Sequence, residues 1–201
     1  MSLFRPTILR LPFAGAAALL LAGCISFGED PPPALLTLTP DAQIETGTGP
    51  SGNATAALTV MRPETPGSLA VTRVPVQVDA STIAYLKDAV WVDRPAKLFQ
   101  NLLVTTIRER TGRLVLDDVE SRAGTGVILR GTLRDFGYDA SSGSAIVTYD
   151  AIRESNGRLE TRRFTSRISG VPAEASPVGN ALNTAANAVA LDVAEWIGGA
   201  S

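Results

Sequence analysis

The chain has 201 residues and a single cysteine, Cys24, which is the feature that most constrains its fold. Arg5 and Arg10 precede an uncharged, mostly apolar run from Leu11 to Ala22, and the run ends in Leu21-Ala22-Gly23-Cys24. Basic residues, a short apolar run and small residues before a cysteine are typical of a signal peptide with a lipobox. Because no second thiol is present to form a disulfide, ordinary packing must hold the mature domain together.

The apolar run is too short to remain as a membrane span, which needs about 20 consecutive apolar residues. We therefore expect residues 1–23 to be removed and Cys24 to be the lipid attachment site, carrying acyl chains such as palmitate. Residues 24–33 end in consecutive prolines and predict an extended tether of roughly 25–30 Å. This order predicts a lipid-anchored protein that faces an extracytoplasmic compartment.

The composition argues against several classes of function. The sequence contains no histidine, the commonest general base and metal ligand. The formal net charge is −2, from 18 basic and 20 acidic residues, which gives no electrostatic footprint for nucleic acid. We expect a protein that is not an enzyme, with no catalytic residues, no cofactor, no metal and no nucleic-acid partner.

The first half of the domain, which we expect to span residues 34–201, is predicted from alternation and turn residues. A first short strand covers Ala34–Thr39, and a mobile loop follows near residues 40–55. Leu69–Val78 alternates as an edge strand, because Pro75 cannot donate to a ladder. The pattern then predicts a short apolar patch and a second short strand, at Ile83–Leu86 and Ala89–Val92.

Two amphipathic helices are predicted. The first begins at Pro95 with Asp93 as its cap and ends near Gly112, where a left-handed cap is expected. Its apolar stripe consists of Leu98, Phe99, Leu102, Leu103, Thr106 and Ile107. The second opens at Ser176-Pro177 and ends at Gly198-Gly199, with one face formed by Val178, Leu182, Ala185, Val189, Val193 and Trp196.

Three or four strands should fill the region between the helices, at Arg113–Leu116, Val127–Tyr138, Ala145–Glu154 and Leu159–Ser169. The last three should form an antiparallel meander. Asn156-Gly157 predicts a two-residue type I′ hairpin turn, since both residues tolerate positive φ. The predicted fold class is therefore α+β, a single domain with a mainly antiparallel or mixed sheet and two amphipathic helices packed on one face.

Three short patterns have better explanations than a functional site. Residues 47–52 spell G-x-G-x-x-G, but no long strand leads into them and no clear helix follows, so a dinucleotide site is not expected. Asn53-Ala54-Thr55 spells a glycosylation acceptor, although the lipobox indicates a bacterial protein. Asp117, Asp118 and Glu120 do not have the spacing of a calcium loop and are better explained as a solvated turn.

Two groups of residues suggest contact surfaces. One predicted strand carries four arginines: Arg158, Arg162, Arg163 and Arg167. Guanidinium groups can bind phosphates or an acidic partner. However, strand alternation places these arginines on both faces of the sheet, which favours a charged, solvent-facing strand. Tyr85 and Trp91 form a candidate partner contact, because aromatic residues dominate interface hot spots. Core packing explains Trp91 about as well.

The lipobox and several short segments together resemble the ABC-type transport auxiliary lipoprotein family. The segments are Leu69–Val76, Tyr85–Asp88, Trp91–Pro95, Leu98–Arg110 and Thr111–Leu116. The resemblance runs through nearly all of the mature chain. It implies a non-catalytic subunit that works with an ABC permease, its ATPase and a membrane-anchored Mce-domain protein to move lipid between the inner and outer membranes.

On this basis we expect an adaptor on the outer membrane of a Gram-negative bacterium, facing the periplasm. Ile25 and Ser26, after Cys24, are not the aspartate that retains lipoproteins at the inner membrane of enteric bacteria. Self-association into a homo-oligomer stays open. One alternative is a periplasmic lipid-binding carrier, which needs an apolar cavity between sheet and helices. Another is an envelope hydrolase that uses serine, lysine or carboxylates.

Overall fold

The computed structural model describes residues 34–42, 47, 49–53, 56–118 and 126–199. The chain divides into two units, Met1–Pro31 and Pro32–Ser201, and every described residue belongs to the second. The predicted signal peptide, lipid attachment site and tether therefore lie outside the described residues. In the described part, none of the helices has the length and apolar character needed to cross a membrane.

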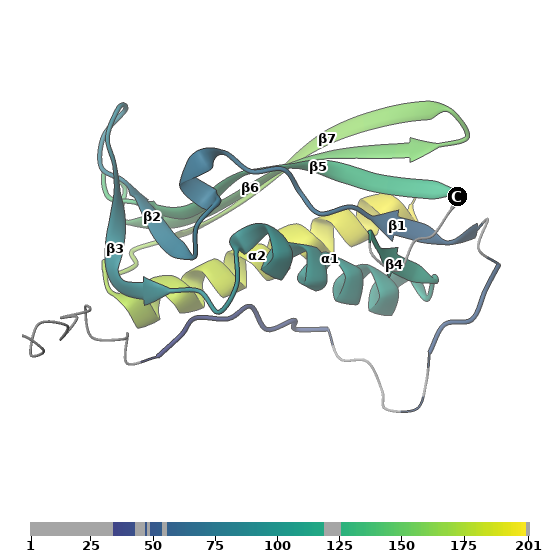
Figure 1. Cartoon of the computed structure of the whole chain (residues 1–201), viewed down its shortest axis with the longest axis horizontal. Coiled ribbons are helices and arrows are strands. Elements are labelled where there is room, and N and C mark those ends of the chain that lie inside the picture. Colours follow the sequence, from purple (N-terminus) through teal and green to yellow (C-terminus); the bar gives the residue numbers. More distant parts are fainter. Residues whose placement is uncertain (1–33, 43–46, 48, 54–55, 119–125, 200–201) are drawn as a thin grey trace, which may run out of the picture. The chain divides into compact units, whose positions relative to one another are not determined.

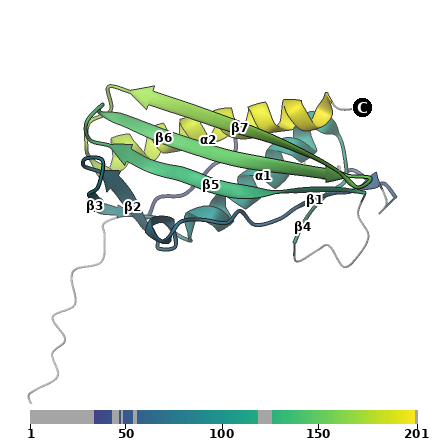
Figure 2. The ribbon, with the colours of Figure 1, turned by 90° about the horizontal axis from the view of Figure 1, so that it is seen from above.

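Seven strands of the described residues form one mixed sheet. Its long strands are β5 (Val127–Asp139), β6 (Ser144–Ser155) and β7 (Arg158–Ser169), which pair as an antiparallel meander (Figure 2). Asn156 and Gly157, which join the last two, have φ angles of 51° and 74°, as a type I′ turn requires. The predicted meander and its turn are confirmed.

The other side of β5 is shared by two short strands. β1 (Leu58–Val60) runs parallel to the start of β5, and β2 (Arg73–Gln77) runs parallel to its end. A 3-10 turn, η2 (Gly67–Leu69), lies between them in the chain. β4 (Val115–Asp117) extends the sheet beyond β1, and β3 (Ile83–Val90) extends it beyond β2.

Both helices cover the same face of this sheet (Figure 1). All the predicted stripe residues of α1 (Pro95–Thr111) are buried, and five of the six predicted on α2 (Ala175–Gly198) are buried too. The ring of Phe99 on α1 meets the ring of Tyr149 on β6 edge-on, with their centroids 5.3 Å apart. The predicted α+β fold with two helices on one face is confirmed.

Several predictions about the first half of the domain were wrong. Residues 34–39 form no strand, and only Leu36 bridges to Trp91. β2 lies inside the sheet between β3 and β5, and a register shift between Arg73 and Pro75 accommodates the missing proline N–H. β3 is one strand, Ile83–Val90, where a separate patch and strand were predicted.

The cap of α1 also differs from the prediction at one end. The helix does begin at Pro95, but the carboxylate of Asp93 accepts a hydrogen bond from the amide of Arg94 and caps none of the helix amides. Arg94 occupies the cap position with extended backbone angles. At the other end Gly112 has a φ of 62° and its amide donates to the carbonyl of Arg108, so the predicted left-handed cap is confirmed.

Candidate functional surfaces

The first described residues lie against α2 and fix the point at which the tether joins the domain. The amide of Thr39 donates to Asn183 Oδ1 over 2.8 Å. Asn187 makes two further bonds, donating from Nδ2 to the carbonyl of Thr39 and accepting from the amide of Asp41 at Oδ1, both over 2.9 Å. We call residues 36–41 the strap. Its hydrogen bonds hold the start of the domain along the helix.

Gly179 on α2 shows how closely the strap approaches the helix. A Cβ atom at this position would lie 2.6 Å from a methyl carbon of Leu36, which is closer than carbon atoms can pack. Leu36 in turn bridges to Trp91, so the strap joins α2 to the segment that follows β3. A small residue in the helix therefore makes room for the strap.

The structure separates the two aromatic residues that were predicted as a partner contact. Trp91 is 1% exposed and packs against Phe136 with ring centroids 5.3 Å apart, so it is a core residue and not a contact surface. Tyr85 is half-buried on β3, and the guanidinium of Arg73 lies 4.8 Å from its ring centroid. Core packing explains Trp91, whereas Tyr85 is only partly buried.

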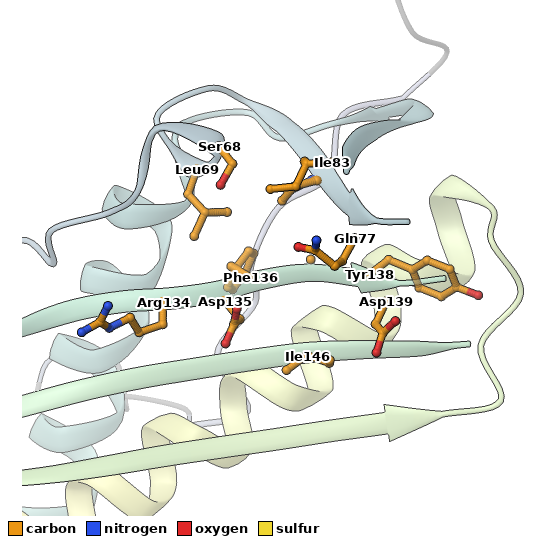
Figure 3. A pocket seen from close by; sticks show the side chains of 12 residues that line it. Ser68, Leu69, Gln77, Ile83, Arg134, Asp135, Phe136, Tyr138, Asp139 and Ile146 are labelled. Carbon is orange, nitrogen blue, oxygen red and sulfur yellow. The ribbon is translucent and has the colours of Figure 1, made fainter. Parts of the chain in front are cut away.

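A small pocket lies where β2, β3 and η2 meet β5 (Figure 3). Its volume is about 70 Å³, and its walls combine Leu69 and Ile83 with the polar side chains of Gln77, Arg134 and Asp139. A cavity of this volume admits only a few waters. The pocket is thus too small to enclose a lipid chain.

Ion pairs cover the face of the sheet opposite the helices. Asp150 on β6 accepts from Arg163 over 2.5 Å and from Arg134 over 2.8 Å. The Arg163 hydrogen bond, followed by that of Arg134, lowers the pKa of Asp150 to about 2. Asp139 accepts from the hydroxyls of Ser141 and Ser142, which hold its pKa well below the ordinary value. Both carboxylates are anchored as charged groups and are poorly suited to carry a proton at neutral pH.

The predicted row of arginines on β7 is divided between the two faces of the sheet, as strand alternation requires. Arg163 pairs with Asp150 on the outer face, and Arg167 lies 3.5 Å from the carboxylate of Asp139. The guanidinium of Arg162 lies over the ring of Phe164, which packs against Trp196 of α2. β7 is therefore a charged edge strand, and charge on an edge discourages unwanted pairing.

A more open groove lies at the end of the domain where both helices finish. Its volume is about 880 Å³, and its walls include Arg110, Arg113 and Glu195. Arg113 donates to the carbonyl of Ala56, while Arg110 lies 3.4 Å from the neighbouring carboxylate of Glu109. The groove is polar and wide, so it resembles a solvated surface more than a ligand pocket.

Side chains fill the space between sheet and helices. Phe99, Leu103 and Tyr149 are fully buried there, and so are the alanines and valines on the inner face of α2. Burial raises the pKa of the Tyr149 phenol, so it stays protonated and cannot act as a base. This packing is what a structural core requires and leaves the two layers in direct contact.

The acidic turn after β4 makes other contacts than metal ligation. Asp117 lies 3.6 Å from the ammonium of Lys97, and Asp118 accepts from the side-chain amide of Gln100. Among the described residues, no group of acidic residues has the geometry to hold a metal ion. Glu120 and part of the predicted loop near 40–55 lie outside the described residues.

Comparison with known proteins identifies the family. The family model described as the ABC-type transport auxiliary lipoprotein component matches residues 36–194. The chain belongs to this family. It is thus an auxiliary lipoprotein component of ABC-type transport, which fits a location in the cell envelope. The resemblance found in the sequence is confirmed.

Solved structures share the fold of this auxiliary component. An uncharacterised protein is 15% identical with a TM-score of 0.63, over 71% of this chain and 92% of that chain. A protein from Xanthomonas campestris, assigned to the family DUF330, is 16% identical with a TM-score of 0.61, over 83% of this chain and 92% of that chain. At these identities the likeness shows the fold alone. No curated protein was found to match the chain.

Proposed function

We propose that this protein is a non-catalytic outer-membrane lipoprotein subunit of an ABC/Mce-type lipid transport system. In this role it acts as a periplasmic adaptor between the outer membrane and the inner-membrane transporter of a Gram-negative bacterium. The observation that carries the proposal is the family match over residues 36–194, nearly the whole of the described domain. Its partners are an Mce-domain protein and the ABC permease with its ATPase.

The architecture supports an adaptor because each end of the polypeptide segment between lipid and domain has a defined attachment. Cys24, with its acyl chains, attaches one end to the membrane, and two or more acyl signals make such anchoring stable. The strap attaches the other end to α2 through Asn183 and Asn187. A force applied to the tether would therefore be transmitted through the strap to α2.

The rival proposal is a periplasmic lipid-binding carrier. A carrier needs an apolar cavity large enough to enclose an acyl chain, whereas the layers meet through fully buried side chains such as Phe99 and Leu103. Purified lipidated protein, stripped of detergent and analysed by mass spectrometry, distinguishes the two. The adaptor should carry only its covalent acyl chains, and stoichiometric co-purifying phospholipid would favour the carrier.

The anchor provides a test of the adaptor mechanism. Cys24→Ala should fold normally but leave the membrane fraction, and cells that carry it in place of the wild-type chain should lose function. The measurement is lipid exchange between the inner and outer membranes after deletion of the chain and complementation with each form. Full complementation by the soluble Cys24→Ala form would show that the adaptor mechanism is wrong.

A further inference from the structure

We propose that an exposed apolar cluster at the start of the domain rests on the membrane surface to which Cys24 is anchored. The cluster consists of Leu35, Val71 and Val92, which are 53%, 39% and 51% exposed. The inference rests on the lipid anchor of the proposed function. It adds an orientation, because it assigns one surface of the domain to the bilayer.

Backbone hydrogen bonds bring the three segments of the cluster together. The amide of Leu36 donates to the carbonyl of Val90, and the amide of Val92 donates to the carbonyl of Leu36. On the other side, the amide of Trp91 donates to the carbonyl of Thr72. Leu35, Val71 and Val92, which directly precede or follow these bonded residues, therefore lie in three adjacent segments.

Two of the three exposed residues of the cluster follow or precede an inward-facing one. Trp91 is buried and Leu36 packs against α2, while their neighbours Val92 and Leu35 are exposed. Three large apolar residues exposed on adjacent segments form a contiguous patch, whereas exposed apolar residues on a soluble domain are normally isolated. The arrangement favours a surface that is covered in the working state.

The side chains around the cluster suit a membrane interface. Arg73 pairs with Val90 across β2 and β3, directly beside the cluster. Its guanidinium lies over the ring of Tyr85, and the Tyr85 hydroxyl is 3.4 Å from the carbonyl of Ser68. Tyrosine is enriched at the headgroup level of bilayers, and arginine is attracted by lipid phosphates. Apolar residues with an arginine and a tyrosine at their rim match the headgroup and acyl boundary.

The short length of the tether indicates that the anchoring membrane is the partner that this apolar cluster contacts. Leu35 follows Cys24 by eleven residues. Even fully extended, a chain of this length spans at most about 40 Å. The cluster therefore cannot leave the neighbourhood of the bilayer. Tethering raises the effective concentration of the surface at the membrane, so that a weak apolar contact is enough to orient the domain.

Fluorescence quenching in vesicles tests the proposal with the full lipidated chain. Acylation consumes Cys24, so Val92→Cys provides a single thiol for an environment-sensitive fluorophore. The matched control is Leu159→Cys, an apolar residue 58% exposed on β7, at the opposite edge of the sheet from β3. In vesicles of phosphatidylethanolamine and phosphatidylglycerol with brominated acyl chains, quenching should be several-fold stronger at position 92. Equal quenching at both positions, or none at 92, would overturn the proposal.

A second variant separates contact by the cluster from mere proximity. With the fluorophore on Val71→Cys, adding Val92→Asp should reduce quenching several-fold, whereas adding Leu159→Asp should leave it unchanged. Identical quenching in the two variants would count against the cluster. The vesicles contain no transporter, so a negative result leaves the adaptor role intact, and failure to find transport partners in cells leaves the vesicle result intact.

Discussion

Replacing Asn187 by alanine should detach the strap from α2 without disturbing the core. Asn187 is 6% exposed, and its side chain makes two hydrogen bonds to the strap, one with the carbonyl of Thr39 and one with the amide of Asp41. Each such bond contributes about 0.5–1.5 kcal/mol net, so the loss is about 1–3 kcal/mol. Alanine is the better helix former and returns about 0.5 kcal/mol.

Asn180→Ala is the matched control, because Asn180 is an exposed residue of the same type on the same helix. It gains the same helix propensity and loses no contact with the strap. The free energy of unfolding in urea should therefore differ between the two variants by about 1–3 kcal/mol. The soluble Cys24→Ala form of the chain suits this measurement.

Native-state hydrogen exchange locates the effect. The amide of Asp41 should exchange roughly 5- to 150-fold faster in Asn187→Ala than in Asn180→Ala, which is the ratio that about 1–3 kcal/mol implies. Core amides should follow only the change in global stability. Equal unfolding free energies, with Asp41 equally protected in both variants, would refute the role assigned to the strap.

Three further predictions concern the core, the sheet and its ion pairs. Phe99→Ala empties a fully buried site and should lower the free energy of unfolding by about 3–5 kcal/mol in urea; a loss below 1 kcal/mol would contradict the packing. Gly137→Ala places a Cβ 2.5 Å from the carbonyl oxygen of Pro75 and should lower the free energy of unfolding by about 1–3 kcal/mol. The control Gly49→Ala meets open space and should change this free energy little. Equal effects of the two substitutions would be inconsistent with the close approach of β2 to β5. The folded-state pKa of Asp150 is about 2, below its ordinary value of 3.8, so its stabilising effect is present above pH 4 and is lost as the pH falls to 2. Asp150→Asn should therefore flatten the pH dependence of Tm between pH 4 and pH 2. An unchanged profile would argue against a stabilising ion pair between Asp150 and Arg163.

The parts of the fold that could be predicted from the sequence are those with a strong local signal. The α1 stripe repeats at helical spacing over nearly three turns, and Gly112 then provides the left-handed cap. Asn156-Gly157 fixes the register of the β6–β7 hairpin on its own. These signals require no knowledge of the rest of the chain.

The errors occur where tertiary pairing decides the structure. β1 has only three residues, Leu58–Val60, and it forms because β4 and β5 supply partners on both sides. Pro75 indicated an edge, but a register shift lets β2 sit between two neighbours. Short segments carry too little periodicity to reveal such partners.

For the candidate surfaces too, residues with a local sequence signal could be predicted, whereas residues that depend on tertiary contacts could not. Cys24 could be singled out from the lipobox alone, because peptidase and acylation signals are local. Trp91 was ambiguous, since a short strand does not show which of its faces is buried, and the contact with Phe136 decides it. The strap could not be predicted at all, because Asn183 and Asn187 contact residues more than 140 positions earlier. Two asparagines one turn apart on a helix give no sign of such a partner.

The most direct test of the adaptor role is crosslinking in intact membranes, followed by purification of the lipidated chain and identification of its partners by mass spectrometry. Cys24→Ala, purified in the same way, shows which partners depend on the anchor. The adaptor role predicts recovery of an Mce-domain protein together with an ABC permease and its ATPase. Recovery of phospholipid without these partners would contradict it and favour the carrier.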